Sequence, residues 1–150
     1  MTQGLEGWNL ELARWRELQE AIPPSPWVKL FFEAQSWNRV PDAPGVYMVT
    51  GAPPLLRNNP HGTFEKPLYI GQSTTSMRTR FRSHISSRCQ PSLARLRTLY
   101  DDAGYPALFF SFLQLPADQV EKVEAILIEC YGPPANRKRG ISLRVGIPAG

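Results

Sequence analysis

The sequence predicts an α+β fold, in which a small three-stranded antiparallel sheet is flanked by helices and preceded by a two-helix extension. Two short blocks of β-branched and aromatic residues, at 45–49 and 68–71, are bounded by turn residues, as strands are. A third segment, 107–113, alternates well enough to be another strand. Helical spacing occurs at 76–86 and 117–131, and the expected order is strand, strand, helix, helix, strand, helix.

Two helices are expected ahead of the sheet, at 10–21 and 27–37. Asn9 is the expected cap of the first helix, and prolines separate it from the second, which is rich in aromatic and aliphatic residues. We expect this extension, residues 1–39, to pack on a domain formed by residues 40–136. A partner-binding or dimerising surface is the alternative, because the extension carries so many aromatic residues.

The first two strands predict a hairpin that carries two tyrosines. Side chains alternate between the two faces of a strand, so Tyr47 and Tyr69 can meet on one face of the sheet. The connection, 50–65, is rich in Gly, Pro and Asn and predicts a long irregular loop. Arg57 and His61 lie in this loop, and loops beside active sites often carry recognition, although a tolerated insertion is the plainer interpretation.

Segment 76–86 has an apolar residue at every fourth position, which predicts a helix that begins with a capping serine. Arg80 and His84 are four residues apart, so they stack one turn above the other beside the apolar stripe. Arg78 and Arg82 leave on a different face, where they are solvated or contact a nucleic-acid backbone. A structural role is the better interpretation of the histidine taken alone, and only its register with Arg80 favours a functional one.

Segment 117–131 predicts a helix with no internal Gly or Pro, ended by Gly132. Glu124 interrupts the apolar stripe of this helix, whereas Glu121 and Glu129 lie toward the other side. An ionised carboxylate that faces a core is costly unless it is paired or binds a metal, so its position indicates a function. A glutamate paired with an arginine at the edge of the core is the alternative.

The distribution of charge agrees with a nucleic-acid partner without establishing one. The formal net charge is +4, but residues 72–100 hold six arginines and no acid, whereas residues 101–136 hold six acids and one lysine. The C-terminal tail, 137–150, adds four basic residues and no acid. A basic helix pair and a basic tail are the electrostatic footprint of phosphate contacts. For the tail alone, a solvated disordered segment is the better interpretation.

In this order, the residues resemble the GIY-YIG nuclease family, whose name records two tripeptides that here are Gly-Val-Tyr at 45–47 and Tyr-Ile-Gly at 69–71. In that family an arginine and often a histidine follow on a helix, a glutamate lies on a later helix, and an asparagine follows a proline-containing turn. At these places the sequence has Arg80, His84, Glu124 and Asn136. The resemblance covers residues 40–136, and one departure is Gln72, where many relatives carry lysine.

The resemblance implies the GIY-YIG nuclease fold and a metal-dependent DNA endonuclease that hydrolyses phosphodiester bonds with one Mg²⁺ or Mn²⁺ held by Glu124. Tyr47 or Tyr69 would accept the proton of the attacking water, and the sequence leaves open which of them does. Arg80 would contact the phosphate, and His84 would orient a tyrosine or relay its proton. Substrate contacts are expected from Gly71, Gln72, Arg78, Arg82 and Asn136. The last of these would contact substrate or brace the site, and an ordinary turn residue is nearly as good an interpretation of it.

Several other functions agree with the same residues. A nucleic-acid-binding module with weak or no cleavage, an RNA-directed nuclease and a plain α+β interaction domain are the alternatives. A restriction or mobile-element nuclease needs sequence specificity, for which the chain shows no zinc finger or separate recognition domain. A repair or recombination nuclease reads DNA shape, so it needs fewer residues beyond the nuclease domain.

The sequence favours a cytoplasmic protein that is a monomer or a homodimer. It carries no basic start followed by an apolar run and no stretch long enough to span a bilayer. Cys89 and Cys130 are too few for a disulfide framework or a metal cluster.

Overall fold

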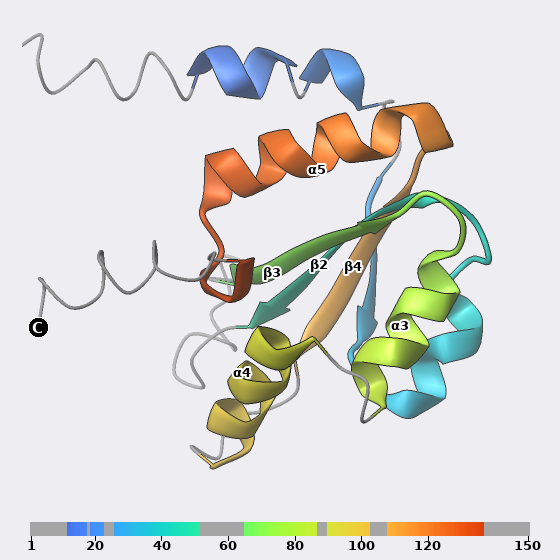
Figure 1. Ribbon diagram of the computed structural model, residues 1–150, viewed down its shortest axis with the longest axis vertical. Helices are drawn as coiled ribbons and strands as arrows, with labels where there is room; N and C mark the ends of the chain where they lie inside the picture. Colours follow the sequence, from blue (N-terminus) through green and yellow to red (C-terminus); the bar gives the residue numbers. More distant parts are fainter. Residues whose placement is uncertain are drawn as a thin grey trace, which may run out of the picture.

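The computed structural model describes residues 12–17, 19–22, 26–51, 65–86, 90–102 and 108–136. An antiparallel sheet lies at the centre with helices on both sides (Figure 1), so the predicted α+β fold is confirmed. Within the described residues the sheet has four strands rather than three. Their order across the sheet is β1 (Val28–Phe31), β4 (Phe109–Gln114), β2 (Gly45–Gly51) and β3 (Lys66–Ser73). Strand β3, which carries the second tripeptide, is therefore an edge strand.

The fourth strand corrects the prediction of a helix at 27–37. This segment forms β1 and the start of a 3-10 helix, η1 (Ala34–Arg39), in place of one α-helix. A short apolar run fits a strand as well as a buried helix, so spacing alone does not distinguish them. Pairing with β4 favours the strand, because it satisfies backbone groups of β4, buries Leu30 and places the Phe31 ring 5.2 Å from that of Phe109.

Three helices are described after β2, and the first and the last of them follow the expected local signals. They are α3 (Met77–Ile85), α4 (Pro91–Asp102) and α5 (Ala117–Tyr131). The N–H of Thr79 donates to the Ser76 hydroxyl over 3.2 Å, which caps α3 as predicted. Helix α5 has the predicted bounds and ends at Gly132, whose φ of 54° is in the left-handed region that favours glycine.

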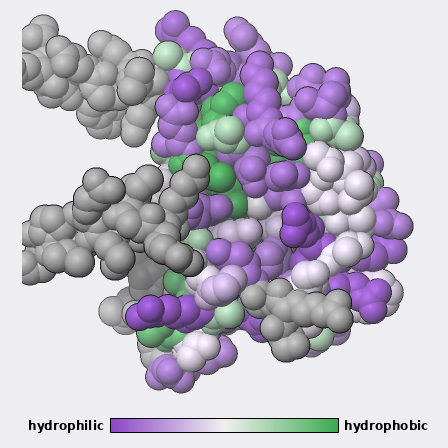
Figure 2. Space-filling view, in the orientation of Figure 1, coloured by the Kyte–Doolittle hydropathy of each residue, from purple (hydrophilic) through white to green (hydrophobic). Residues whose placement is uncertain are grey.

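Each face of the sheet carries its own apolar core. Tyr47 and Phe110 belong to a core that includes side chains of α3 and α4, whereas Val46 and Ile70 belong to a core that includes side chains of α5. Neighbouring residues of β2 therefore point to opposite faces. Hydrophilic side chains predominate on the surface seen in Figure 2, and hydrophobic ones show between them in patches.

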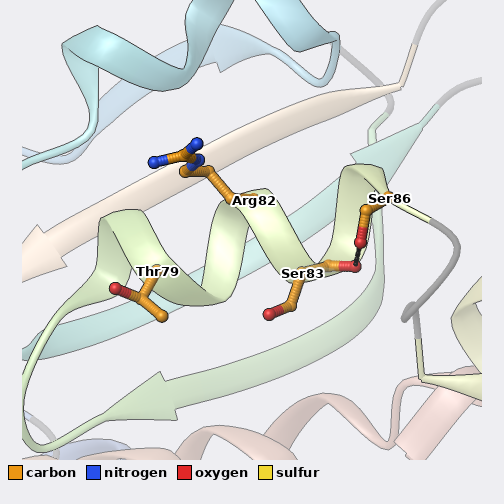
Figure 3. A pocket seen from close by; sticks show the side chains of 4 residues that line it. All are labelled: Thr79, Arg82, Ser83 and Ser86. Carbon is orange, nitrogen blue, oxygen red and sulfur yellow. Dashed lines mark hydrogen bonds between the residues drawn. The ribbon is translucent and has the colours of Figure 1, made fainter.

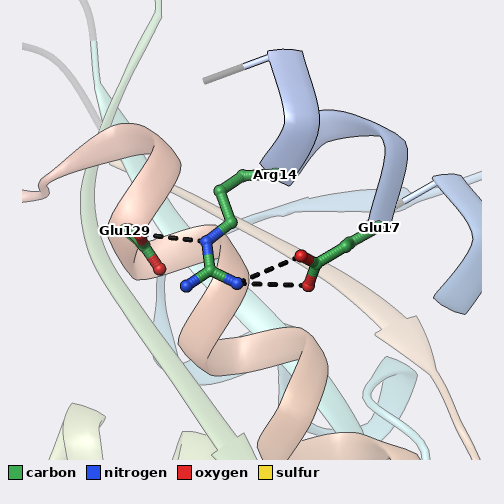
Figure 4. Close-up of polar contacts among 3 residues, drawn as sticks. All are labelled: Arg14, Glu17 and Glu129. Atoms are coloured by element: carbon green, nitrogen blue, oxygen red, sulfur yellow. Dashed lines mark hydrogen bonds and ion pairs between the residues drawn. The ribbon is translucent and has the colours of Figure 1, made fainter. Parts of the chain in front are cut away.

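The N-terminal helical residues, 12–17 and 19–21, lie along the outer side of α5 (Figures 1 and 4). Arg14 Nε lies 3.0 Å from a carboxylate oxygen of Glu129 on α5, and its Nη1 lies 3.1 Å from Glu17. These side chains are largely solvent-accessible, so each ion pair contributes little to stability. The Trp15 and Tyr131 rings, with centroids 6.0 Å apart, add an aromatic contact between the same two segments.

Some predicted features lie outside the described residues. They are the cap Asn9, the loop residues Arg57 and His61, Cys89 and the basic tail 137–150. No helix in the described part of the chain has both the length and the apolar character needed to cross a membrane.

Candidate nuclease active site

The register between β2 and β3 brings the two tyrosines together. Tyr47 pairs with Gly71, and Val49 pairs with Tyr69, so the tyrosines are diagonal neighbours on one face. Their ring centroids are 6.3 Å apart. A Cβ atom at Gly71 would lie 2.5 Å from both Cζ and Oη of Tyr47. The glycine of the second tripeptide is therefore required because the Tyr47 ring lies across it.

His84 of α3 completes a cluster of three rings with Tyr47 and Tyr69. The imidazole centroid lies 5.6 Å from the Tyr47 ring and 5.4 Å from the Tyr69 ring, in edge-on arrangements. Tyr47 Oη and His84 Nε2 are 2.7 Å apart and share a hydrogen bond whose donor depends on the imidazole tautomer. Tyr47 is 1% and His84 3% exposed, whereas Tyr69 is half-buried. Tyr69 is thus the only member of the ring cluster with substantial access to solvent.

Burial favours neutral forms of the two inner rings. Burial first, and then the positive charges of Arg80 and Arg97, lower the pKa of His84 to about 4, so its imidazole is neutral at pH 7. Burial raises the pKa of Tyr47 well above its ordinary value; Tyr69 adds to this shift, and Arg80 opposes it. His84 Nδ1 is buried without a hydrogen-bond partner among the described residues, which is unusual for a purely structural side chain.

Arg80 is exposed on α3, one turn before His84. It lines an open pocket at the start of α3 together with Gln72, Ser73, Thr74, Thr75, Ser76, Thr79 and Ser83. Its positive charge affects the pKa values of Tyr47, His84 and Glu124, so all three lie within its electrostatic range. On this flank of α3 the imidazole is directed into the ring cluster and the guanidinium remains accessible to a ligand.

Glu124 is half-buried on α5, next to the buried Val123. Burial and then the negative charge of Glu121 raise the pKa of Glu124, while Arg80 opposes this. The ion pairs among the described residues involve Arg14 and Lys29 and none includes Glu124. The expected alternative, in which this carboxylate is paired with an arginine at the edge of the core, is therefore not seen in the described part of the chain.

The donor chemistry at Glu124 suits a divalent cation that keeps most of its water shell. In the described residues, no group of three or more His, Cys, Asp or Glu side chains is arranged to enclose a metal ion. Mg²⁺ is commonly held by one or two carboxylates with waters and substrate phosphates, whereas structural zinc requires four protein ligands. A single half-buried carboxylate fits the magnesium pattern.

Asn136 braces the edge strand that carries Tyr69. It ends η2 (Pro134–Asn136), the 3-10 turn that follows α5. Its Oδ1 accepts a hydrogen bond from the N–H of Ile70 over 2.6 Å, and its Nδ2 donates to the Ile70 carbonyl over 2.7 Å. This geometry corresponds to the bracing interpretation rather than to a substrate contact, because both ends of the amide are used on the strand.

The other expected substrate residues are spread around α3. Arg78 is half-buried, and its Nε donates to the carbonyl of Val40 over 2.7 Å, which anchors the end of η1. Arg82 is exposed, and its guanidinium carbon lies 4.9 Å from the ring centroid of Trp37. Gln72 lines the Arg80 pocket, and its Oε1 is buried without a partner among the described residues.

Arg97 contacts the site although the sequence did not single it out. From α4, its Nη1 donates to the His84 carbonyl over 2.7 Å, and its guanidinium lies 5.1 Å from the Phe32 ring. The contact joins α3 and α4. The periodicity of either helix does not specify how the two helices pack together.

Comparison with solved structures finds similarity to the GIY-YIG N-terminal endonuclease domain of UvrC from Thermotoga maritima. The form bound to its catalytic divalent cation, magnesium, has a TM-score of 0.46 and 21% identity, with 69% of this chain and 93% of that chain covered. Two point mutants of that domain, each bound to the catalytic divalent cation, have TM-scores of 0.47, identities of 20% and 21%, and the same coverage. No family model matches the chain, and no curated protein matches it. All three structures are forms of this one GIY-YIG endonuclease domain.

Proposed function

We propose that this protein is an endonuclease that hydrolyses phosphodiester bonds of DNA with Mg²⁺ or Mn²⁺ held by Glu124. The observation that carries the proposal is the ring cluster of Tyr47, Tyr69 and His84 next to the exposed Arg80 and within electrostatic range of Glu124. Phosphodiester hydrolysis requires a proton acceptor for water, positive charge at the phosphate and stabilisation of the leaving oxygen. A phenol, a guanidinium and a carboxylate that holds a cation meet these requirements.

Tyr69 is the better candidate for the base. It is half-buried, whereas Tyr47 is buried and its raised pKa disfavours the phenolate. A phenol must be ionised to accept a proton, and nearby positive charge favours that ionisation. The bound cation would add such charge and polarise the phosphate. The hydrogen bond between Tyr47 and His84 then has a positioning role, because it fixes the two rings against which Tyr69 packs.

Arg80 is placed to contact a phosphate. Its side chain is exposed at a pocket whose other lining residues are mainly hydroxyl-bearing, so an anionic group meets no acidic side chain there. A guanidinium donates two parallel hydrogen bonds to phosphate oxygens, and its charge is permanent. We therefore assign to Arg80 the stabilisation of charge that develops on the phosphate during hydrolysis.

The test is cleavage by the purified protein. Supercoiled, linear, branched and single-stranded DNA and single-stranded RNA are incubated with Mg²⁺, with Mn²⁺ or with chelator. Glu124→Gln is compared with Asp118→Asn, which removes one exposed carboxylate from the first turn of the same helix. We expect cation-dependent DNA cleavage by the unaltered protein and by Asp118→Asn, and none by Glu124→Gln.

Other outcomes favour different functions. DNA that is bound but left intact under every condition supports a binding module without cleavage. Cleavage confined to RNA supports the RNA-directed alternative. Equal cleavage by Glu124→Gln and the unaltered protein rejects the assigned metal ligand.

A further inference from the structure

We infer that the outer face of α3, together with η1, binds an unpaired nucleotide of the DNA substrate, with its base against Trp37 and its phosphate at Arg82. The inference rests on the proposed function, which makes DNA the substrate. It specifies the substrate class further, as DNA that has a single-stranded segment beside the bond that is cut.

Three depressions border α3, and they share lining residues in pairs. The first is the Arg80 pocket already described. The second is lined by Thr79, Arg82, Ser83 and Ser86, and it shares Thr79 and Ser83 with the first. The third lies between η1 and α3 and shares Arg82 with the second. Shared lining residues therefore relate the Arg80 pocket to the depression beside η1.

The middle depression has the chemistry of a phosphate and sugar contact. Arg82 extends from α3 toward η1, whereas Thr79 and Ser83 project from a different side of the helix (Figure 3). Hydroxyl and guanidinium groups are common partners of phosphate oxygens in complexes with DNA. No acid occurs in residues 72–100, so a polyanion that follows α3 meets no acidic side chain from this part of the chain.

The third depression has the chemistry of a base-stacking site. It is lined by Ala34, Trp37, Phe81, Arg82 and Ile85, so all but one of its side chains are apolar. The Trp37 side chain is 40% exposed, although it is among the largest apolar residues of the protein. Aromatic side chains stack on unpaired bases of any sequence. A duplex keeps its bases stacked on each other, so this depression favours an unpaired one.

Two arginines hold Trp37 in place for this role. The guanidinium carbons of Arg82 and Arg78 lie 4.9 and 5.6 Å from its ring centroid. Arg78 is also hydrogen-bonded to the Val40 carbonyl, which fixes η1 against α3. Arg82 has no such backbone bond among the described residues, so it can contact a phosphate while it remains beside the indole. A purely structural role of Trp37 does not account for the open depression that runs from it to Ile85.

The experiment measures DNA binding by fluorescence anisotropy in the Glu124→Gln background, so that the probes are not cut. The probes are a blunt duplex and the same duplex with a single-stranded extension. We expect Trp37→Ala to weaken binding of the extended duplex by roughly 5- to 150-fold, the range for loss of one base stack on an aromatic ring. Binding of the blunt duplex should change by less than about twofold. Trp37→Phe, which keeps a ring, should retain most of the preference for the extended duplex.

Trp15→Ala is the matched control, because Trp15 is a comparably exposed tryptophan (48%) on the N-terminal segment. It should change neither affinity. Arg82→Ala should weaken binding of the extended duplex more than binding of the blunt duplex, and it should reduce the dependence of the affinity for the extended duplex on salt. If circular dichroism shows that Trp37→Ala melts at a lower temperature than the protein with Trp37, a second measurement uses the protein with Trp37 intact. The DNA probe then carries 2-aminopurine in its single-stranded extension. Its fluorescence should be quenched by the protein at a fixed distance from the junction.

The inference is overturned if Trp37→Ala weakens both probes equally or neither, or if 2-aminopurine fluorescence does not change at any position. Failure of the proposed function is a separate result. A protein that binds and cuts DNA but does not distinguish the two probes overturns only the single-strand site. A protein that binds neither the blunt duplex nor the extended duplex overturns both proposals.

Discussion

Tyr47 and His84 share a hydrogen bond of 2.7 Å between Oη and Nε2, and both side chains are almost completely buried. The bond joins β2 to α3, two elements that are 37 residues apart at this contact. It therefore fixes the helix that presents Arg80 against the strand that carries the first tripeptide. Phe110 stacks on the Tyr47 ring with a centroid separation of 4.8 Å, so this ring is held by packing as well as by hydrogen bonding.

Replacement of each tyrosine by phenylalanine should separate positioning from catalysis. Tyr47→Phe removes the partner of a buried imidazole nitrogen, so we expect the free energy of unfolding to fall by about 1–3 kcal/mol. Tyr69→Phe should affect stability less, because Tyr69 is half-buried, and lower single-turnover cleavage by about 10²- to 10⁴-fold. Urea unfolding and single-turnover kinetics measure the two effects. Intact cleavage by Tyr69→Phe, with a large loss for a well-folded Tyr47→Phe, assigns the base to Tyr47 instead.

The buried imidazole should make stability depend on pH. The pKa of His84 is lowered from 6.5 to about 4 in the folded protein, mainly by burial, so the unfolded chain binds the proton more readily. Its contribution to stability is fully present above pH 6.5 and is lost as the pH falls from 6.5 to about 4. The expected loss is up to roughly 3 kcal/mol. Urea unfolding across this range should give a flatter pH dependence for His84→Gln; equal slopes for the two proteins contradict the assignment.

Glu124 should have the opposite linkage. Its pKa is raised in the folded state, so its favourable contribution is present below the unfolded pKa and is lost as the pH rises through the folded pKa. Without a divalent cation at pH 7, Glu124→Gln should therefore raise the melting temperature. Added Mg²⁺ should stabilise the unaltered protein and Asp118→Asn but not Glu124→Gln. Thermal melts with Mg²⁺ or chelator test this, and a Mg²⁺ response retained by Glu124→Gln places the cation elsewhere.

Two glycine substitutions should differ in their effect on cleavage. Gly71→Ala places a Cβ 2.5 Å from the Tyr47 ring, so the ring must shift, and both stability and cleavage should fall. Gly132→Ala is the control, because Gly132 has a left-handed φ of 54° and open space around its Cα. It should cost about 1–2 kcal/mol of stability through backbone strain and leave cleavage of the folded protein unchanged. Equal cleavage by the two variants contradicts a positioning role of the Tyr47 ring.

Removal of the Asn136 amide should loosen the edge strand that carries Tyr69. Asn136→Ala leaves the N–H and carbonyl of Ile70 without their side-chain partner, so we expect a loss of about 1–3 kcal/mol of stability. Hydrogen exchange at the Ile70 amide should accelerate more than exchange in β4, one of the two inner strands of the sheet. Unchanged protection at Ile70 rejects the brace.

The sequence by itself determined the features that depend on neighbours along the chain. Apolar spacing and terminal residues predicted α5 with its observed bounds and α3 with its serine cap. Alternation in the two blocks predicted that Tyr47 and Tyr69 share a face. The same spacing marked Glu124 as a carboxylate inside an apolar stripe, and the structure has it half-buried. These features are local because helix and strand periodicities fix which residues share a face.

The tertiary structure alone decided which distant segments meet. The helix expected at 27–37 gives way to β1 because the free edge of β4 pairs with it, and local spacing does not contain that partner. Burial distinguishes Tyr47, which lies on an inner strand, from Tyr69, which lies on an edge strand, and local spacing does not contain the order of the strands. The contact of Arg97 with α3 likewise depends on how two helices pack. Sequence spacing specifies the face on which a side chain lies, and the register and packing of distant elements specify what it meets there.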